Sequence, residues 1–314
     1  MQRDGFVKRQ ASIIFRVAIG VAALVFEVAQ THAQTLEPRS YSNSPVGLNF
    51  LLAGYEYTEG SVAFDPSLPI SDAHLHTNAT FLAYARSLNA WGDSAKFDVE
   101  LPYVWLEGSA LAGGSPRQRD VSGVADPSFR FSVNFYGAPA LSAKEFADYH
   151  QDFIVGASLR VFAPFGQYDD TKLVNIGTNR WTIKPELGIS KALGSWTLEL
   201  SPAVTFYTEN HDFFNGNTLS QYPLYSVQGH IIHTFSSGIW FALDGTHYVG
   251  GRITVNGSTQ DTWQSITRAG LTVALPINRN NSVKIYTSTG VSSLSGGDFT
   301  VISVYWQYRW GGGL

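Results

Sequence analysis

Apolar and polar residues alternate with a period of two along most of the chain. Between residues 95 and 105, one face carries Phe97, Val99, Leu101, Tyr103 and Trp105, and the other carries Lys96, Asp98 and Glu100. Successive side chains of a β-strand point to opposite faces, so this alternation predicts strands with one apolar and one polar face. The same reasoning predicts about twelve strands, at 46–57, 78–88, 95–105, 129–135, 153–161, 181–190, 196–206, 224–235, 239–248, 268–275, 283–286 and 302–310.

The connections between these strands alternate between long and short. The long ones are 58–77, 107–127, 164–180, 208–223, 249–261 and 291–298, and the short ones are 89–94, 193–195, 236–238 and 276–281. One connection on the short side, 138–151, is long and contains a segment expected to form one or two helical turns. Short periplasmic turns and longer external loops are typical of outer-membrane barrels. The predicted fold is therefore all-β, a closed antiparallel transmembrane β-barrel.

Alternation alone also fits a secreted β-sandwich or jelly roll. The tryptophans favour the barrel, because they fall at strand ends rather than in strand centres. Trp105, Trp181 and Trp263 lie beside long loops, whereas Trp91, Trp196, Trp240 and Trp310 lie beside short turns or the C-terminus. We expect them to form the two interfacial girdles of a membrane barrel.

Composition supports this prediction and excludes several classes of protein. Only 15% of the 314 residues are charged, against about 25% in soluble domains, while 14% are aromatic. A chain with no cysteine has no disulfide framework, thiolate metal site or cysteine nucleophile. A net charge of −4 offers no basic surface for nucleic acid.

The N-terminus has the order of a secretory signal. Basic residues precede an apolar core at 17–26, and small residues follow up to Ala33. We expect a signal peptide at 1–33 that is cleaved after Ala33, a periplasmic segment at 34–45, the barrel at 46–310 and a tail at 311–314. An anchoring helix is the alternative. Export in this form predicts the outer membrane of a Gram-negative bacterium.

Short motifs in the second half of the chain carry a family resemblance. They are Pro164–Asp169, Asn175, Gly177, Asn179–Trp181, Lys184–Glu186, Phe206–Asn210, Gln221–Tyr225, His230, Gly250–Gly251, Asn256–Gly257, Arg268–Gly270 and Lys284. With them the chain, from Pro45 to Trp310, resembles the outer-membrane family named for the MetA pathway of phenol degradation. The resemblance implies an outer-membrane barrel of the kind described as transporters, linked by name to the catabolism of aromatic compounds. The last strand, ending in Trp306–Trp310, also resembles the signal recognised by the outer-membrane assembly machinery.

Candidate catalytic groups are few, and we expect no enzyme and no cofactor. His230, His233 and His247 lie near Ser226, Ser236 and Asp244, so a phospholipase-like barrel hydrolase is an alternative. The pairs Asp98–Glu100 and Asp169–Asp170 are interpreted as lumen or loop charges rather than acid/base pairs. His74 and His76 have a spacing that suits a metal ligand pair, but a solvated external loop without metal is expected there.

The polar face of the strands is the stronger functional signal, since charges that line a pore set its selectivity. The predicted lumen-lining residues are Lys96, Asp98, Glu100, Arg130, Asn134, Arg160, Lys184, Glu186, Glu199, Arg268, Lys284, Tyr286, Gln307 and Arg309. Because about twelve strands leave a wide interior, we expect a monomeric channel for the passive passage of small molecules. The basic excess of the set predicts a preference for anions, with aromatic or other hydrophobic and anionic nutrients as candidate solutes. The expected partners are outer-membrane lipid, these solutes and the assembly machinery. A closed structural or adhesion barrel is the other alternative.

Overall fold

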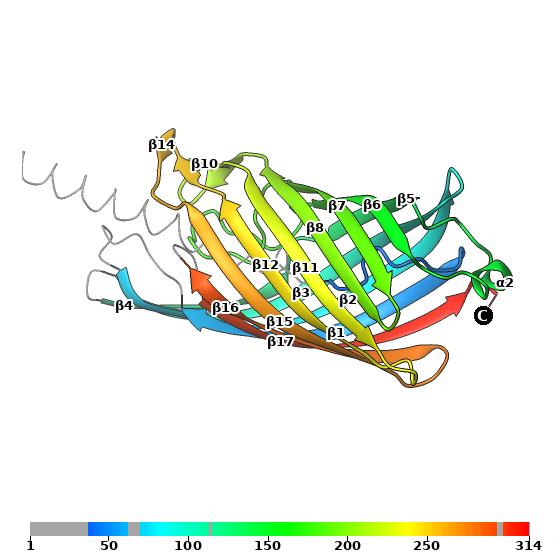
Figure 1. The fold of residues 1–314 in the computed structure, drawn as a ribbon. Helices are drawn as coiled ribbons and strands as arrows, with labels where there is room; N and C mark the ends of the chain where they lie inside the picture. The colour runs from blue at the N-terminus through cyan, green and yellow to red at the C-terminus, as the bar shows by residue number, and fades with distance from the viewer. Residues whose placement is uncertain (1–36, 62–69, 113–114, 294–297, 314) are drawn as a thin grey trace, which may run out of the picture.

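The computed structural model describes residues 37–61, 70–112, 115–293 and 298–313. Twelve antiparallel strands close into a barrel, because the first strand pairs with the last (Figure 1). The barrel strands are β1 (Leu48–Ser61), β2 (Ile70–Ala90), β3 (Asp93–Ala112), β5 (Ser128–Tyr136), β6 (Phe153–Phe162), β7 (Thr182–Leu193), β8 (Trp196–Tyr207), β11 (Leu224–Thr234), β12 (Trp240–Gly250), β15 (Gln264–Pro276), β16 (Asn281–Ser293) and β17 (Asp298–Gly311). The predicted fold class is confirmed. The predicted signal peptide lies outside the described residues.

The short connections gather at one end of the barrel, here called the turn end. Trp91 and Gly92 adopt positive φ angles of 57° and 94° and join β2 to β3. The long connection before β6 contains the expected helical turn, α2 (Ala143–Phe146), which begins with a capping box between Ser142 and Glu145. Figure 1 shows α2 and the C-terminus at this end of the molecule.

The opposite end, here called the loop end, holds more β-structure than the sequence predicts. The segment 107–127 is not a loop, because β3 continues to Ala112 and returns as β4 (Ser115–Val124). The predicted loops 208–223 and 249–261 contribute a separate sheet of β9 (Asn210–Phe213), β10 (Asn217–Gln221), β13 (Ile253–Val255) and β14 (Ser258–Thr259). This small sheet has its own buried apolar cluster, made by Phe213, Leu219, Ile253 and Val255.

The barrel wall alternates as predicted, with apolar side chains outside and polar ones inside. Leu101, Leu187 and Leu243 are about half exposed on the outer face, whereas Ser190 and Ser303 are fully buried inside. Among the described residues, no helix is long and apolar enough to cross a bilayer. The girdle prediction is wrong for Trp240, whose ring lies under a guanidinium inside the barrel.

An apolar cluster lies inside the barrel at the loop end. Ile176, from the connection between β6 and β7, is buried against the inward-facing Leu75, Leu106 and Phe299. A connection predicted as an external loop therefore packs against the inside of the wall. The polar part of the lumen lies nearer the turn end.

Candidate functional site

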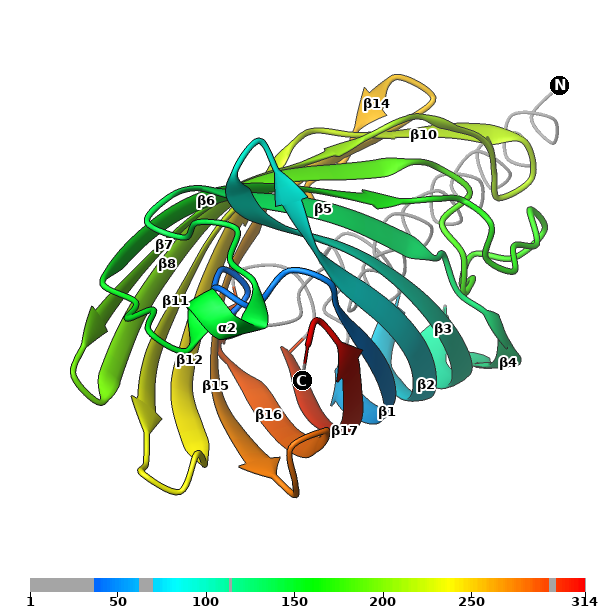
Figure 2. The same ribbon diagram turned by 90° about the vertical axis from the view of Figure 1, so that its right-hand side faces the viewer.

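Residues 37–47, here called the strap, lie inside the barrel before β1 begins. Figure 2 shows this segment in blue within the ring of strands, next to α2. Its far end is anchored by backbone hydrogen bonds, because Val46 N donates to Leu141 O at 2.8 Å and Gly47 N donates to Ser87 O at 3.0 Å. The remainder of the strap pairs with no strand and is held by side chains of the wall. Part of the predicted N-terminal segment 34–45 thus occupies the lumen.

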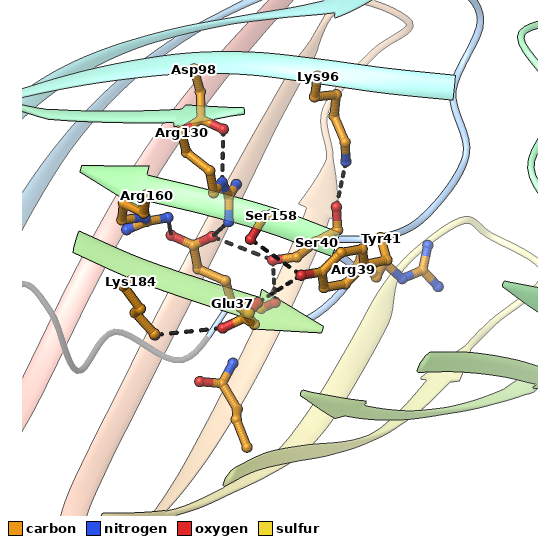
Figure 3. A network of polar contacts seen from close by, with 12 residues as sticks. Glu37, Arg39, Ser40, Tyr41, Lys96, Asp98, Arg130, Ser158, Arg160 and Lys184 are labelled. Atoms are coloured by element: carbon orange, nitrogen blue, oxygen red, sulfur yellow. Dashed lines mark hydrogen bonds and ion pairs between the residues drawn. The ribbon is translucent and has the colours of Figure 1, made fainter. Parts of the chain in front are cut away.

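The Glu37 carboxylate forms the first anchor of the strap, through ion pairs with two arginines. Arg130 Nη1 lies 2.5 Å from Oε2, and Arg160 Nη2 lies 2.8 Å from Oε1 (Figure 3). Arg130 is fixed in turn by Asp98, whose Oδ1 lies 2.9 Å from the arginine Nε. Burial alone would raise the pKa of Glu37, but the two guanidiniums outweigh it and hold that pKa well below its ordinary value. Glu37 is therefore an anion bound between two cations.

Tyr41 forms a second anchor on the neighbouring strands. Its hydroxyl donates to Glu186 Oε1 at 3.0 Å and lies 3.2 Å from Ser158 Oγ. The ring is 3% exposed and lies over Gly156 and Gly188. Because neither glycine has a β-carbon, the ring reaches the backbone of β6 and β7.

Arg39 forms the third anchor, on the far side of the strap. Its backbone N donates to Glu199 Oε2 at 2.8 Å, and its guanidinium donates to Thr234 Oγ1. The guanidinium also lies 4.9 Å from the ring centroid of Trp240, within the range of a cation–π contact. Trp240 shares the inward face of β12 with Ala242 and Asp244, and the guanidinium lies over its ring there.

Wall side chains also satisfy backbone carbonyls of the strap. Lys96 Nζ donates to Ser40 O at 2.6 Å, and Asn134 Nδ2 donates to Tyr41 O at 3.0 Å. A segment with no β-partner needs such donors when it is withdrawn from water. The strap is thus fitted to this wall by polar groups rather than by an apolar core.

The structure brings together more than half of the predicted lumen residues around the strap. Some of these residues bond to the strap directly, and others form ion pairs with the residues that do. The set is Lys96, Asp98, Arg130, Asn134, Arg160, Lys184, Glu186 and Glu199. The others lie elsewhere. Arg268 donates to Ser288 Oγ and Phe299 O, Tyr286 packs with Tyr305, and Arg309 donates to Arg279 O in the turn before β16. Glu100 and Gln307 lie half-buried on β3 and β17.

One predicted lumen residue, Lys284, links the strap to an aromatic cluster. Its ammonium lies 4.8 Å from the ring centroid of Tyr305, and its charge also acts on Glu37. Phe81, Tyr286, Val301 and Tyr305 form the cluster, in which the rings of Phe81 and Tyr305 are 4.8 Å apart. A buried aromatic cluster therefore lies beside Lys284.

The histidine candidates do not assemble a hydrolase. His230 Nδ1 lies 2.6 Å from Asp244 Oδ1, so one pair of a triad is present. The other ring nitrogen faces Gln228 Nε2 at 2.8 Å, where a hydrolase needs a hydroxyl nucleophile. Both side chains are buried inside the wall, away from the lipid face. His233 instead contacts the ring of Trp196 at a tilt of 53°, and His247 faces Thr267 on the outside.

The predicted loop position of His74 and His76 is wrong, because both residues lie on strand β2. His76 pairs with Glu107 of β3 at 3.2 Å. No group of three or more possible metal ligands occurs in the described part of the chain. The two carboxylate pairs do not act as acid/base pairs either. Asp98 forms an ion pair with Arg130, and Asp169 accepts a hydrogen bond from the backbone N of Thr171 in a loop.

Sequence reasoning missed the strap, although the chain carries two signals for it. The first is the pair of charges at Glu37 and Arg39, directly after the predicted export signal. The second is glycine at 156 and 188, two inward positions of otherwise regular strands. Small residues there mark places where another backbone or ring approaches closely.

Comparison with known proteins places the chain in a family. The family model described as "Putative MetA-pathway of phenol degradation" matches residues 59–303. Comparison with curated proteins gives no match.

Solved structures share the architecture. The COG4313 outer membrane channel from Pseudomonas putida F1 superimposes with a TM-score of 0.73 at 19% identity, covering 88% of this chain and 100% of that one. The transport unit of the autotransporter AIDA-I from Escherichia coli gives a TM-score of 0.51 at 8% identity, covering 90% of this chain and 96% of that one. At these identities the likeness shows the fold, a barrel that resembles outer-membrane proteins of Gram-negative bacteria.

Proposed function

We propose that this chain, which belongs to the family of the MetA pathway of phenol degradation, is an outer-membrane channel for the passive passage of small molecules. The strap carries the proposal, because it fills the lumen through polar contacts with a charged wall. Such a filling differs from a packed core, since water and ions replace its contacts when it leaves. Export through a cleaved signal peptide, assembly by the outer-membrane machinery and a monomeric state belong to the same proposal. In this orientation the turn end faces the periplasm.

We also propose a preference for anions, including aromatic and other hydrophobic acids. Around the strap, the wall places four bases, Lys96, Arg130, Arg160 and Lys184, against three acids, Asp98, Glu186 and Glu199. Charges at a constriction decide which ions pass. With the strap withdrawn, this ring has a net positive charge.

Recording in planar bilayers tests both parts of the proposal. The wild-type protein should show small, brief conductance steps with a reversal potential on the anion side in a salt gradient. Arg160→Glu should move that potential toward the cation side, whereas Arg279→Glu, at an exposed position in the turn before β16, should leave it unchanged. The absence of conductance in the wild type and in Glu37→Gln would leave the closed structural barrel as the better function. Cation preference in the wild type would contradict the anion preference alone.

A further inference from the structure

We propose that Arg130 and Arg160 form a binding site for solute carboxylates, which the strap closes by placing its own carboxylate, that of Glu37, between them. A permeating carboxylate would compete with Glu37 and release the strap. This inference rests on the proposed channel function and gives that channel a substrate class and a gate.

The geometry of Glu37 is that of a bound carboxylate ligand. Each carboxylate oxygen accepts from a different guanidinium, at 2.5 and 2.8 Å. Both contacts are charge-assisted hydrogen bonds, which are shorter and stronger than those between neutral groups. Nothing in these contacts depends on the rest of the glutamate side chain, so a free carboxylate fits the same donors.

Removal of Glu37 leaves a charge that attracts another anion. Arg130 keeps its pair with Asp98, whereas the ion pair of Arg160 is with Glu37. Lys184 and Lys284 act on the same region, one from β7 and the other from β16. Burying an unpaired guanidinium is costly, so the emptied site favours occupation by a new carboxylate.

A small cavity already lies beside Glu37. Its volume is about 20 Å³, enough for about one water molecule. The lining residues are Glu37, Ser40, Arg130, Ser158, Arg160, Lys184, Glu186, Ser201 and Gln228. Since Glu37 and Ser40 belong to the strap, their departure enlarges this cavity into a site open to solutes.

The arginine pair sets the class of ligand. The aromatic residues near Lys284, which are Phe81, Tyr286 and Tyr305, are buried and present no exposed surface to a solute. Small carboxylates are therefore the inferred ligands, and benzoate is the probe.

A single-cysteine reporter measures release of the strap without relying on current. The natural chain has no cysteine, and the hydroxyl oxygen of Ser44 is buried with no hydrogen-bond partner among the described residues. Ser44→Cys therefore changes little in the closed state and places a shielded thiol in the strap. In lipid vesicles, benzoate should accelerate labelling of this thiol by a water-soluble maleimide by roughly tenfold, the ratio that corresponds to about 1.4 kcal/mol. Benzyl alcohol, which has the ring without the carboxylate, should not.

Two further variants separate the site from a general loosening of the barrel. Glu37→Gln in the reporter chain should label rapidly without benzoate and respond little to it, and it should bind benzoate more tightly in calorimetry because the internal competitor is gone. Glu56→Gln removes a different lumen carboxylate, one that accepts from Ser303, and should leave slow, benzoate-dependent labelling intact. Heat-modifiable mobility on gels checks that each variant is folded.

Each outcome bears on one proposal. Equal labelling with benzoate and benzyl alcohol, or equal benzoate affinity in the wild type and Glu37→Gln, would overturn the carboxylate site even if the protein conducts ions. Absence of conductance in both proteins would overturn the channel, whether or not benzoate binds. Acceleration by benzoate together with conductance supports both.

Discussion

The ring of Tyr41 occupies the space that a side chain on Gly188 would take. A β-carbon built on Gly188 would lie 2.0 Å from Tyr41 Cε2 and 2.4 Å from Tyr41 Cζ, and the three nearest atoms all belong to that ring. Strand β7 and the strap therefore fit together only while residue 188 has no side chain. This position gives a way to expel the strap by adding a single methyl group.

Gly188→Ala should release the strap from the lumen while leaving the ring of twelve strands intact. The added methyl overlaps Tyr41, and overpacking of this kind costs about 1–3 kcal/mol. The cost is avoided when Tyr41 leaves its position against Glu186. Single-channel recording should show larger or longer openings than in the wild type. Gly245→Ala is the matched control, because a β-carbon there meets nothing within 4 Å. Equal openings in the two variants would contradict the role of the contact between Tyr41 and Gly188 in holding the strap.

The strap should also respond to acid through Glu37. The guanidiniums of Arg130 and Arg160, with Lys284 behind them, hold the pKa of Glu37 well below its ordinary value against the effect of burial. A carboxylate with a depressed pKa stabilises docking at every pH above its free value of about 4.3, and this contribution is lost as the pH falls through the docked pKa. Because maleimide reacts with the thiolate, the labelling rate of Ser44→Cys is divided at each pH by that of a small free thiol. This ratio should be low and constant from neutral pH to about pH 5, and then rise at lower pH.

Glu37→Gln is the control for that titration, since it removes the group that takes up the proton. The wall carboxylate of Asp98, which holds Arg130, is kept in this variant. An acid-dependent rise of the same size in Glu37→Gln would assign the response to the wall and not to the carboxylate of the strap.

His230 and Asp244 should contribute to stability and not to hydrolysis. Asp244 accepts from His230 through Oδ1 and from Thr272 Oγ1 through Oδ2 at 2.7 Å, and both members of the pair are buried. His230→Ala leaves a buried carboxylate with one partner fewer, at a cost of about 1–3 kcal/mol. The unfolding midpoint in urea should fall, while phospholipid hydrolysis stays at background in both proteins. Measurable hydrolysis in the wild type that is lost in the variant would revive the hydrolase alternative.

Strand alternation predicted the barrel because each strand of the wall faces lipid on one side and a polar lumen on the other. Phe97 and Lys96 show the rule, being exposed outside and half-buried inside. Strand β4 escaped prediction because Ser115–Val124 is polar and solvent-exposed on both faces for most of its length. It pairs with β3 through backbone hydrogen bonds, which leave no hydrophobic period in the sequence.

The partners of the strap could not be predicted from local sequence. Its contacts join residues far apart in the chain, such as Arg39 with Glu199 and Glu37 with Arg160. Alternation predicts Arg130, Arg160 and Glu186 on the inner face, but their partners lie on a segment without periodicity.

The outer face of β5 gives a test of the barrel's orientation toward lipid. Phe131 points outward between Phe97 of β3 and Leu159 of β6, and all three are exposed on the wall. A cation on the lipid face of a membrane barrel costs about 2–4 kcal/mol near the bilayer centre. Phe131→Arg should therefore lower the urea midpoint of folding into vesicles and reduce the heat-modifiable folded form. Phe131→Leu keeps an apolar group at the same position and should fold like the wild type. Normal folding of the arginine variant would mean that this face meets water, as in a soluble sandwich.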